Sequence, residues 1–223
     1  MSCHPDPMEH SFVRPYSPRD EAAVRRICFE TALYGQSMQP LLDDVDLVSE
    51  AFVGYYLQSE ADNVLVAMDR GEVAGYLCAC LDTERFERRF ARRVAPRLLG
   101  RFLVRGYWLR FRIWCLFASG VRYALRWRAT HDDVLRAYPA HVHLNIDAQH
   151  QRRGLGGRLL DEGLERMRRD GTPGVHISTD TEGGRHIFAR AGFVLLKSYD
   201  IQSVRDGGPL TVSVMGRKLG GDA

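Results

Sequence analysis

A glycine-rich, basic turn between two apolar segments constrains this chain more than any other feature. Before the turn, residues 140–146 (AHVHLNI) alternate between apolar and polar side chains, which is the pattern of a half-buried strand. After the turn, apolar residues recur at helical spacing from Gly154, and Gly171 and Pro173 are typical of a helix end. The sequence therefore predicts a strand, a glycine turn and a helix in succession.

Three arginines, Arg152, Arg153 and Arg158, lie at the predicted start of this helix. The first N–H groups of a helix have no intrahelical acceptor and bind anions, and glycine allows a phosphate to approach the backbone closely. We therefore expect a ligand that carries phosphate. The alternative is an ordinary helix start whose arginines are solvated.

Two well-known phosphate loops do not fit this turn. The nucleotide P-loop requires a lysine after its glycines, and no lysine lies near the turn. The dinucleotide fingerprint requires a third glycine at the position of Leu159. The pattern that fits is Q-x-x-G-x-G over residues 151–156, which resembles the loop that binds the coenzyme A pyrophosphate in the GNAT superfamily of N-acetyltransferases.

Other stretches resemble the same superfamily in the same order along the chain. Residues 11–32 resemble its first strand and helix, and residues 63–82 resemble its central hairpin, with a turn at Asp69–Gly71. Residues 174–193 resemble its next strand and helix. A narrower resemblance, to bacterial acetyltransferases related to the acetyltransferase-like domain of O-GlcNAc hydrolases, lies in the stretches RRICFETALYGQ, GYLCACLDTERF, YPAHVHLNI and GVHI.

The resemblance implies an α/β GNAT (acyl-CoA N-acyltransferase) fold, a mixed twisted sheet flanked by helices. We expect residues 1–223 to form a single domain, with residues 1–10 and 219–223 disordered. The implied activity is acetyl-CoA-dependent N-acetyl transfer to an amine that the sequence does not identify. The alternatives are a non-catalytic pseudo-acetyltransferase domain that binds coenzyme A, and an interaction module.

The resemblance also implies which residues hold acetyl-CoA. The family's coenzyme-binding strand exposes backbone groups that by position belong to Leu144, Asn145 and Ile146. The family's frequent thiol-protonating tyrosine falls at Phe188, and its frequent asparagine falls at Thr181. Both departures affect proton delivery more than coenzyme binding, which rests mostly on backbone groups. The loop residues expected at the coenzyme are Gln151, Arg152, Arg153, Gly154, Leu155, Gly156, Gly157 and Arg158.

Acetyl transfer to an amine also requires a group that removes a proton from the acceptor. His143 and His176 lie on predicted neighbouring strands and have a suitable unperturbed pKa. Asp82, at the end of the second central strand, is a further candidate for contact with the amine, and Tyr76 is a weaker one. Each has a structural alternative, namely a hydrogen-bonded strand histidine, a helix cap or a core aromatic residue.

Residues 84–130 contain the positive excess of the chain. Residues 84–128 include 13 arginines and two acidic residues, a net charge of +11, whereas the rest of the chain has a net charge of −8. Arginines and apolar residues both repeat about every four residues, which predicts a basic helical insertion, kinked at Pro96. A lid, an anionic membrane or nucleic-acid surface, a subunit contact and simple helix packing all fit this pattern. Repulsion between the arginines predicts an acidic partner, which could be Asp43, Asp44 and Asp46 or an anionic substrate.

Other features of the sequence narrow the class of protein. Cys78 and Cys80 lie two residues apart on a predicted strand, so we expect buried core cysteines and no metal site. Neither a signal peptide nor an apolar run long enough to cross a bilayer is present, so a cytoplasmic location is expected. The expected partners are acetyl-CoA and an amine acceptor, with no specific nucleic acid.

Overall fold

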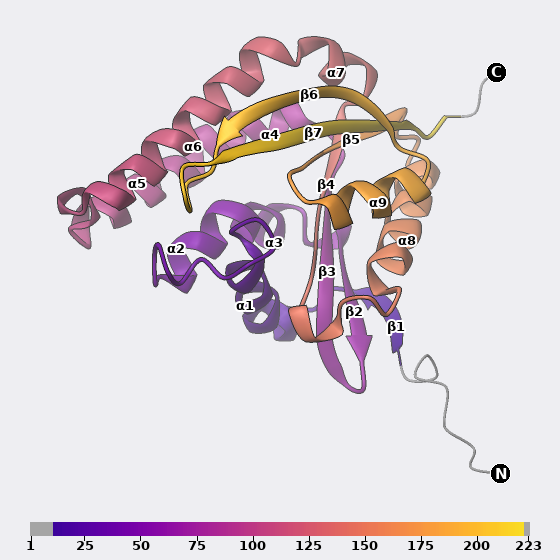
Figure 1. The fold of residues 1–223 in the computed structure, drawn as a ribbon. Helices are drawn as coiled ribbons and strands as arrows, with labels where there is room; N and C mark the ends of the chain where they lie inside the picture. Colours follow the sequence, from indigo (N-terminus) through magenta and orange to yellow (C-terminus); the bar gives the residue numbers. More distant parts are fainter. Residues whose placement is uncertain (1–10, 221–223) are drawn as a thin grey trace.

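The computed structural model describes residues 11–220, without the side chains of residues 112, 122–124, 126 and 128–130. Within that range, seven strands form one sheet in the order β1-β2-β3-β4-β5-β7-β6 (Figure 1). Every neighbouring pair is antiparallel except β4 and β5, which are parallel, so the sheet is mixed as predicted. The strands are β1 (Ser11–Pro15), β2 (Val64–Asp69), β3 (Glu72–Cys80), β4 (Ala140–Ile146), β5 (Gly174–Thr179), β6 (Val194–Gln202) and β7 (Pro209–Lys218).

Helices cover both faces of the sheet. The helix α1 packs against one face of β3 and β4, and α8 packs against the other (Figure 1). Two π-helical segments join neighbouring helices, Glu50–Gly54 between α2 and α3 and Phe90–Val94 between α4 and α5. The helices are α1 (Glu21–Thr31), α2 (Val45–Ser49), α3 (Tyr55–Ser59), α4 (Thr83–Arg89), α5 (Ala95–Val104), α6 (Phe111–Thr130), α7 (Asp132–Ala137), α8 (Leu155–Arg169) and α9 (Glu182–Arg190).

The two faces of β4 differ in chemistry, as the alternating pattern of residues 140–146 predicts. Val142 belongs to the apolar core beneath α8, and Leu144 and Ile146 pack against that core. His143 and Asn145 lie on the opposite face, which α1 and α3 cover. The predicted strand, turn and helix are therefore confirmed, and α8 begins at the residue after Gly154.

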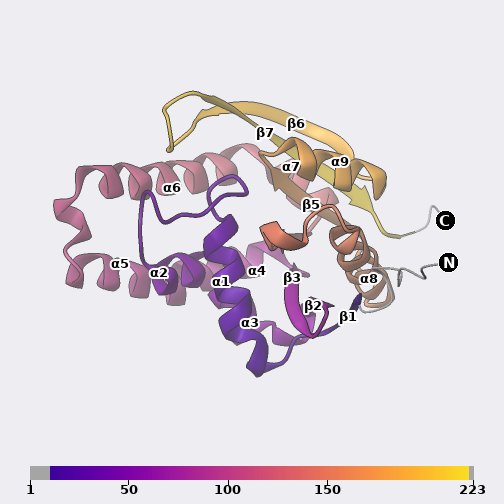
Figure 2. The same cartoon turned by 60° about the horizontal axis from the view of Figure 1, so that its bottom comes forward.

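Residues 84–130 are largely helical, and acidic side chains hold them to the rest of the chain. The Arg105 guanidinium lies 2.8 Å from the Asp44 carboxylate, and the Tyr107 hydroxyl donates to the same carboxylate at 2.9 Å. Arg101 forms a weaker pair with Asp46 at 3.4 Å. The predicted acidic partner of Arg101 and Arg105 is thus the start of α2, at Asp44 and Asp46. Figure 2 shows α5 and α6 extending away from β2, β3 and α8.

The chain ends differ in part from the sequence prediction. Leu219, expected in a disordered tail, is 8% exposed and packs in the core beneath α8, and its N–H donates to the Pro173 carbonyl just after the end of β7. Residues 1–10 and 221–223 lie outside the described residues. Among the described helices, none combines the length and the hydropathy needed to cross a bilayer.

The close approach of β3 to β4 leads to a prediction about stability. A Cβ at Gly75 would lie 2.8 Å from the backbone oxygen of Asn145, whereas one at Gly100 in α5 would meet no atom within 4 Å. Gly75→Ala should therefore lower the free energy of unfolding by about 1–3 kcal/mol. Gly100→Ala should raise it by about 0.5–1 kcal/mol, because alanine favours the helix. Urea unfolding curves measure both changes, and equal stability of the two variants would contradict the account.

Candidate functional site

The strands β4 and β5 separate after two residue pairs. Within the described sheet, β4 pairs with β5 through Ala140 and His141 alone. On its other side, β4 stays paired with β3 as far as Ile146, which lies opposite Gly75. The later residues of β4 therefore have no strand partner on the β5 side. Unpaired backbone groups need an acceptor or donor from water or a ligand, so the separation creates a place for an extended polar molecule.

The glycine turn lies at the end of this opening. Gly154 has a left-handed backbone with φ of 76°, and Arg152 has φ of 62°. The first hydrogen bond of α8 runs from the Arg158 N–H to the Gly154 carbonyl, with a nitrogen–oxygen distance of 3.2 Å. The N–H groups of the residues before Arg158 lie at the N-terminus of α8, where helices bind anions. The Gln151 side chain donates to the Ile146 carbonyl at 3.2 Å and so ties the turn to β4.

The glycines of the turn have different surroundings. A Cβ at Gly154 or at Gly157 would meet no atom within 4 Å, so the backbone there is open to a ligand. A Cβ at Gly156 would lie 3.6 Å from the side chains of Ile146 and Ile187. These are ordinary van der Waals distances, so Gly156 faces the sheet and not the open side of the turn.

The three arginines expected at an anion do not share one role. Arg153 pairs with the buried Asp69 carboxylate at 2.8 Å. Arg158 donates to the backbone oxygen and hydroxyl of Ser11, at 3.0 and 2.9 Å. Arg152 is exposed. Arg153 and Arg158 thus hold the turn and α8 to β2 and β1 although both are exposed, and Arg152 is a third exposed cation at the turn.

His143 lies in a hydrogen-bonded cluster on the α1 side of β4. Its Nε2 atom is 3.1 Å from the Tyr76 hydroxyl and 3.2 Å from the Asn145 amide nitrogen, and that amide donates to the Tyr76 oxygen at 2.8 Å. Burial lowers the pKa of His143 to about 4, so the ring is neutral at pH 7. The Phe52 ring stacks near it, with ring centroids 6.1 Å apart. Tyr76 and Asn145 both meet the Nε2 edge and fix the orientation of the imidazole.

His176 and Asp82 have structural roles here. His176 is 3% exposed, and its Nδ1 donates to the Tyr138 carbonyl at 2.7 Å beside the Trp127 ring. Burial lowers its pKa to about 4. Asp82 is exposed and caps α4 by accepting from the Arg85 N–H at 2.8 Å. These contacts favour the structural alternatives for both residues, whereas His143 lies on the segment of β4 that has separated from β5.

The two positions that depart from the family pattern lie at α9. Phe188 is 7% exposed and packs edge to face against Phe193, with ring centroids 5.4 Å apart. Thr181 caps the helix by accepting from the Gly184 N–H at 3.1 Å. Phe188 is therefore a core residue, and Thr181 supports the start of α9 beside the end of β5.

A charged cluster behind the turn was not found from the sequence. Asp147 pairs with Arg26 of α1 at 2.9 Å, and the His150 ring lies 3.6 Å from the Asp69 carboxylate and 3.9 Å from that of Asp147. Burial opposes ionisation of Asp147, but the Gln149 N–H and Arg26 together hold its pKa below the usual range. The partners are far apart in sequence, so spacing gives no signal for them. His141, between Tyr56 and Thr83, was missed for the same reason.

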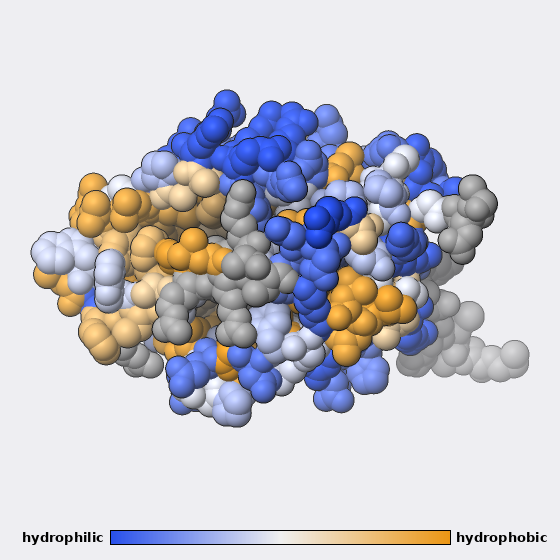
Figure 3. Space-filling view, turned by 90° about the horizontal axis from the view of Figure 1, so that it is seen from above, coloured by the Kyte–Doolittle hydropathy of each residue, from blue (hydrophilic) through white to orange (hydrophobic). Residues whose placement is uncertain are grey.

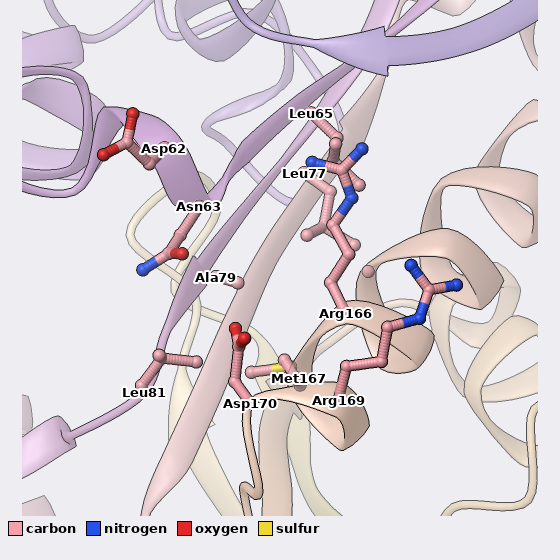
Figure 4. A pocket seen from close by; sticks show the side chains of 11 residues that line it. Asp62, Asn63, Leu65, Leu77, Ala79, Leu81, Arg166, Met167, Arg169 and Asp170 are labelled. Atoms are coloured by element: carbon pink, nitrogen blue, oxygen red, sulfur yellow. The ribbon is translucent and has the colours of Figure 1, made fainter.

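A cavity of about 320 Å³ lies elsewhere on α8 (Figure 4). It is lined by the C-terminal half of the helix, from Gly163 to Asp170, and by Asp62 and the ends of β2 and β3. At 1.5 Å per residue, the length of α8 separates it from the glycine turn by roughly 15–20 Å. The cavity is therefore not part of the opening between β4 and β5.

Comparison with known proteins identifies the fold. No family model matches the chain. The crystal structure of SsHAT has a TM-score of 0.71 and 26% identity, covering 95% of this chain and 100% of that one. The structure of yncA from Salmonella typhimurium, with acetyl-CoA, has a TM-score of 0.60 and 17% identity, covering 96% and 97%. Protein O-GlcNAcase of Rattus norvegicus is 34% identical over 74 residues, which are 33% of this chain and 8% of the rat protein.

These similarities confirm the resemblance predicted from the sequence. The chain has the GNAT fold, with a seven-stranded mixed sheet flanked by helices. The local match to the rat protein supports the narrower resemblance to acetyltransferases related to O-GlcNAc hydrolases.

Burial of His176 leads to a prediction about pH. Its pKa is about 4 in the folded chain, against an ordinary value of 6.5, so the unfolded chain binds the proton first as pH falls. The free energy of unfolding should decrease between pH 6.5 and 4, by up to about 3 kcal/mol from this group. His176→Asn retains a donor for the Tyr138 carbonyl and should remove part of this decrease.

Urea unfolding over this pH range measures the effect. His186→Asn is the control, because the His186 side chain is 76% exposed, and it should keep the wild-type pH dependence. Identical curves for wild type and both variants would show that His176 does not remain neutral in the fold.

Proposed function

We propose that this protein is an acetyl-CoA-dependent N-acetyltransferase that acts on an amine. The observation that carries the proposal is the separation of β4 from β5 directly beside the open N-terminus of α8. The strand offers unpaired backbone groups to an extended amide-containing chain, and the turn offers N–H groups to a diphosphate. Coenzyme A has both features. The acetyl-CoA bound in yncA supports the same assignment by similarity of fold.

The residues of the opening suit acetyl-CoA. The backbone groups of Leu144 and Ile146, on either side of Asn145, would pair with the pantetheine arm, and the turn from Gln151 to Gly157 would hold the diphosphate. The left-handed Gly154 and the open side of Gly157 leave space for phosphate oxygens. The thioester of acetyl-CoA supplies an activated acetyl group when it is bound. The leaving group is a thiolate, and the pKa of a free thiol is about 8.5. A protein acid is therefore helpful but not essential for departure of the thiolate.

His143 is the best-placed group to accept the amine proton. It lies on β4 next to the residues that would hold the pantetheine arm, and the Nε2 contacts of Tyr76 and Asn145 orient its ring. With a pKa of about 4, the imidazole is neutral at pH 7, and in the tautomer whose Nε2–H donates to the Tyr76 oxygen, Nδ1 has the lone pair that accepts a proton. This base is weaker than one with a pKa near 7, so the rate depends more on orientation than on basicity.

A non-catalytic domain that binds coenzyme A is the second candidate function. The observation that favours it is Phe188, which has no hydroxyl and is buried in the core where the family often has a tyrosine. The two candidates share the coenzyme site and differ in turnover.

The proposed diphosphate site is tested by a carboxylate in the first turn of α8. Gly157→Asp should weaken acetyl-CoA binding by at least about tenfold through charge repulsion. The same carboxylate should not destabilise the fold, because an acid at a helix N-terminus is favourable. Calorimetric titration with acetyl-CoA gives the affinity, and thermal unfolding gives the stability.

The matched control places the same charge in the first turn of another helix. Ala22 is exposed in α1, and Ala22→Asp should leave the affinity within about threefold of wild type. If Gly157→Asp binds acetyl-CoA as tightly as Ala22→Asp does, the diphosphate does not bind at the glycine turn.

The proposed role of His143 is tested by turnover with a panel of amines. His143→Gln should lower kcat by about 10²–10⁴, the usual contribution of a general base, and leave acetyl-CoA affinity within about threefold. His186→Gln is the control and should keep wild-type kcat. An unchanged kcat in His143→Gln would exclude this histidine as the base. Wild-type protein that binds acetyl-CoA but acetylates no amine would favour the non-catalytic domain.

A further inference from the structure

A cluster of exposed apolar side chains lies where α5 turns into α6. We call it the apolar tip. It includes some of the most exposed apolar residues in the described chain, with Val104 at 88%, Phe111 at 78% and Leu109 at 71% exposure. Figure 3 shows hydrophobic side chains gathered at this end of the molecule. The tip consists of Leu99, Leu103, Val104, Trp108, Leu109, Phe111 and Trp114.

The fold buries one side of this helical hairpin and leaves the tip uncovered. Phe102, Tyr107 and Ile113 alternate with the tip residues along the chain and pack against the core formed by α1 and α2. The contacts of Arg105 and Tyr107 with Asp44 hold the turn in place. The tip is therefore presented outward on a fixed support, at the end of the hairpin that extends away from the sheet (Figure 2).

Charge indicates what covers the tip. Arg97, Arg105 and Arg110 are exposed around it, and residues 84–128 have a net charge of +11. A second copy of the chain in a two-fold contact would bring these arginines against one another. A nucleic acid would neutralise the arginines but would leave side chains such as Val104 and Leu109 without an apolar environment. An anionic lipid surface provides both an apolar layer and negative headgroups.

We propose that the apolar tip docks on an anionic membrane surface. The tip side chains enter the boundary between headgroups and acyl chains, Trp108 and Trp114 lie at the level that tryptophan prefers, and the arginines contact acidic headgroups. Residues 11–220 include no helix suited to crossing the bilayer, so this contact is interfacial. It would hold the protein at a membrane surface through the end of the hairpin that points away from the sheet. The inference does not depend on catalysis.

Co-sedimentation with lipid vesicles tests the proposal. The full-length protein should bind vesicles of phosphatidylcholine with phosphatidylserine much more tightly than vesicles of phosphatidylcholine alone, and increasing salt should weaken the binding. Binding should also shift the tryptophan emission to shorter wavelength, because Trp108 and Trp114 leave water. The double variant Leu109→Ser and Phe111→Ser should lose at least about tenfold in affinity. Arg97→Glu and Arg110→Glu should each lose about fivefold or more.

The control removes exposed apolar side chains elsewhere. Val194 and Leu195 on β6 are 58% and 61% exposed, and Val194→Ser with Leu195→Ser should bind vesicles as wild type does. Acetyl-CoA titration and thermal unfolding establish that each variant is folded. Failure of folded wild type to bind anionic vesicles at low salt would overturn the proposal, as would equal binding to neutral vesicles.

Two further outcomes would also overturn it. One is self-association of wild type that the Leu109→Ser and Phe111→Ser variant abolishes, without vesicle binding, which would make the tip a subunit interface. The other is salt-sensitive binding to DNA or RNA in place of vesicles, which would make the arginines a nucleic-acid surface.

Discussion

The hydrogen bonding of β4 determines the arrangement of the proposed site. Beyond His141, β3 is the one strand of the described sheet that pairs with β4, and the backbone groups of β4 on the β5 side lack a strand partner. Buried backbone groups without partners are costly, so this side of β4 must face water or a ligand. The glycine turn at the end of the same strand brings the N-terminus of α8 to the opening. The separation of β4 from β5 thus leaves room for the extended pantetheine arm, and the N-terminus of α8 provides the anion site at the end of the same opening.

Contacts with distant parts of the chain make this arrangement rigid. Arg153 joins the turn to β2 through Asp69, and Asp147 joins the end of β4 to α1 through Arg26. Burial of Leu155, Leu159 and Leu160 in the core holds α8 on the sheet. The turn is therefore fixed before a ligand arrives, which reduces the ordering cost of binding. The polar cluster on the other face of β4 is also fixed before a ligand arrives, because Tyr76 and Asn145 orient the His143 imidazole.

Local patterns in the sequence predicted much of this structure. The alternation in residues 140–146, the spacing of leucines in α8 and the resemblance of residues 151–156 to a coenzyme loop all depend on neighbouring residues. The roles of individual side chains were less predictable. The role of His176 depends on the distant Tyr138 carbonyl, to which it donates. The role of Arg153 likewise depends on Asp69, which is far away in the sequence. Exposure of the tip on α5 and α6 could not be predicted either, because an amphipathic pattern does not specify how much of a helix is covered.

A crystal structure of the protein with acetyl-CoA tests the central claim most directly. The account predicts that the diphosphate lies against the backbone N–H groups at the start of α8, between Arg152 and Gly157. It also predicts that the pantetheine amides pair with β4 at residues 144–146, with the thioester on the side of His143. A coenzyme bound in the cavity beside Asp170, or anywhere else away from the opening between β4 and β5, would contradict the account.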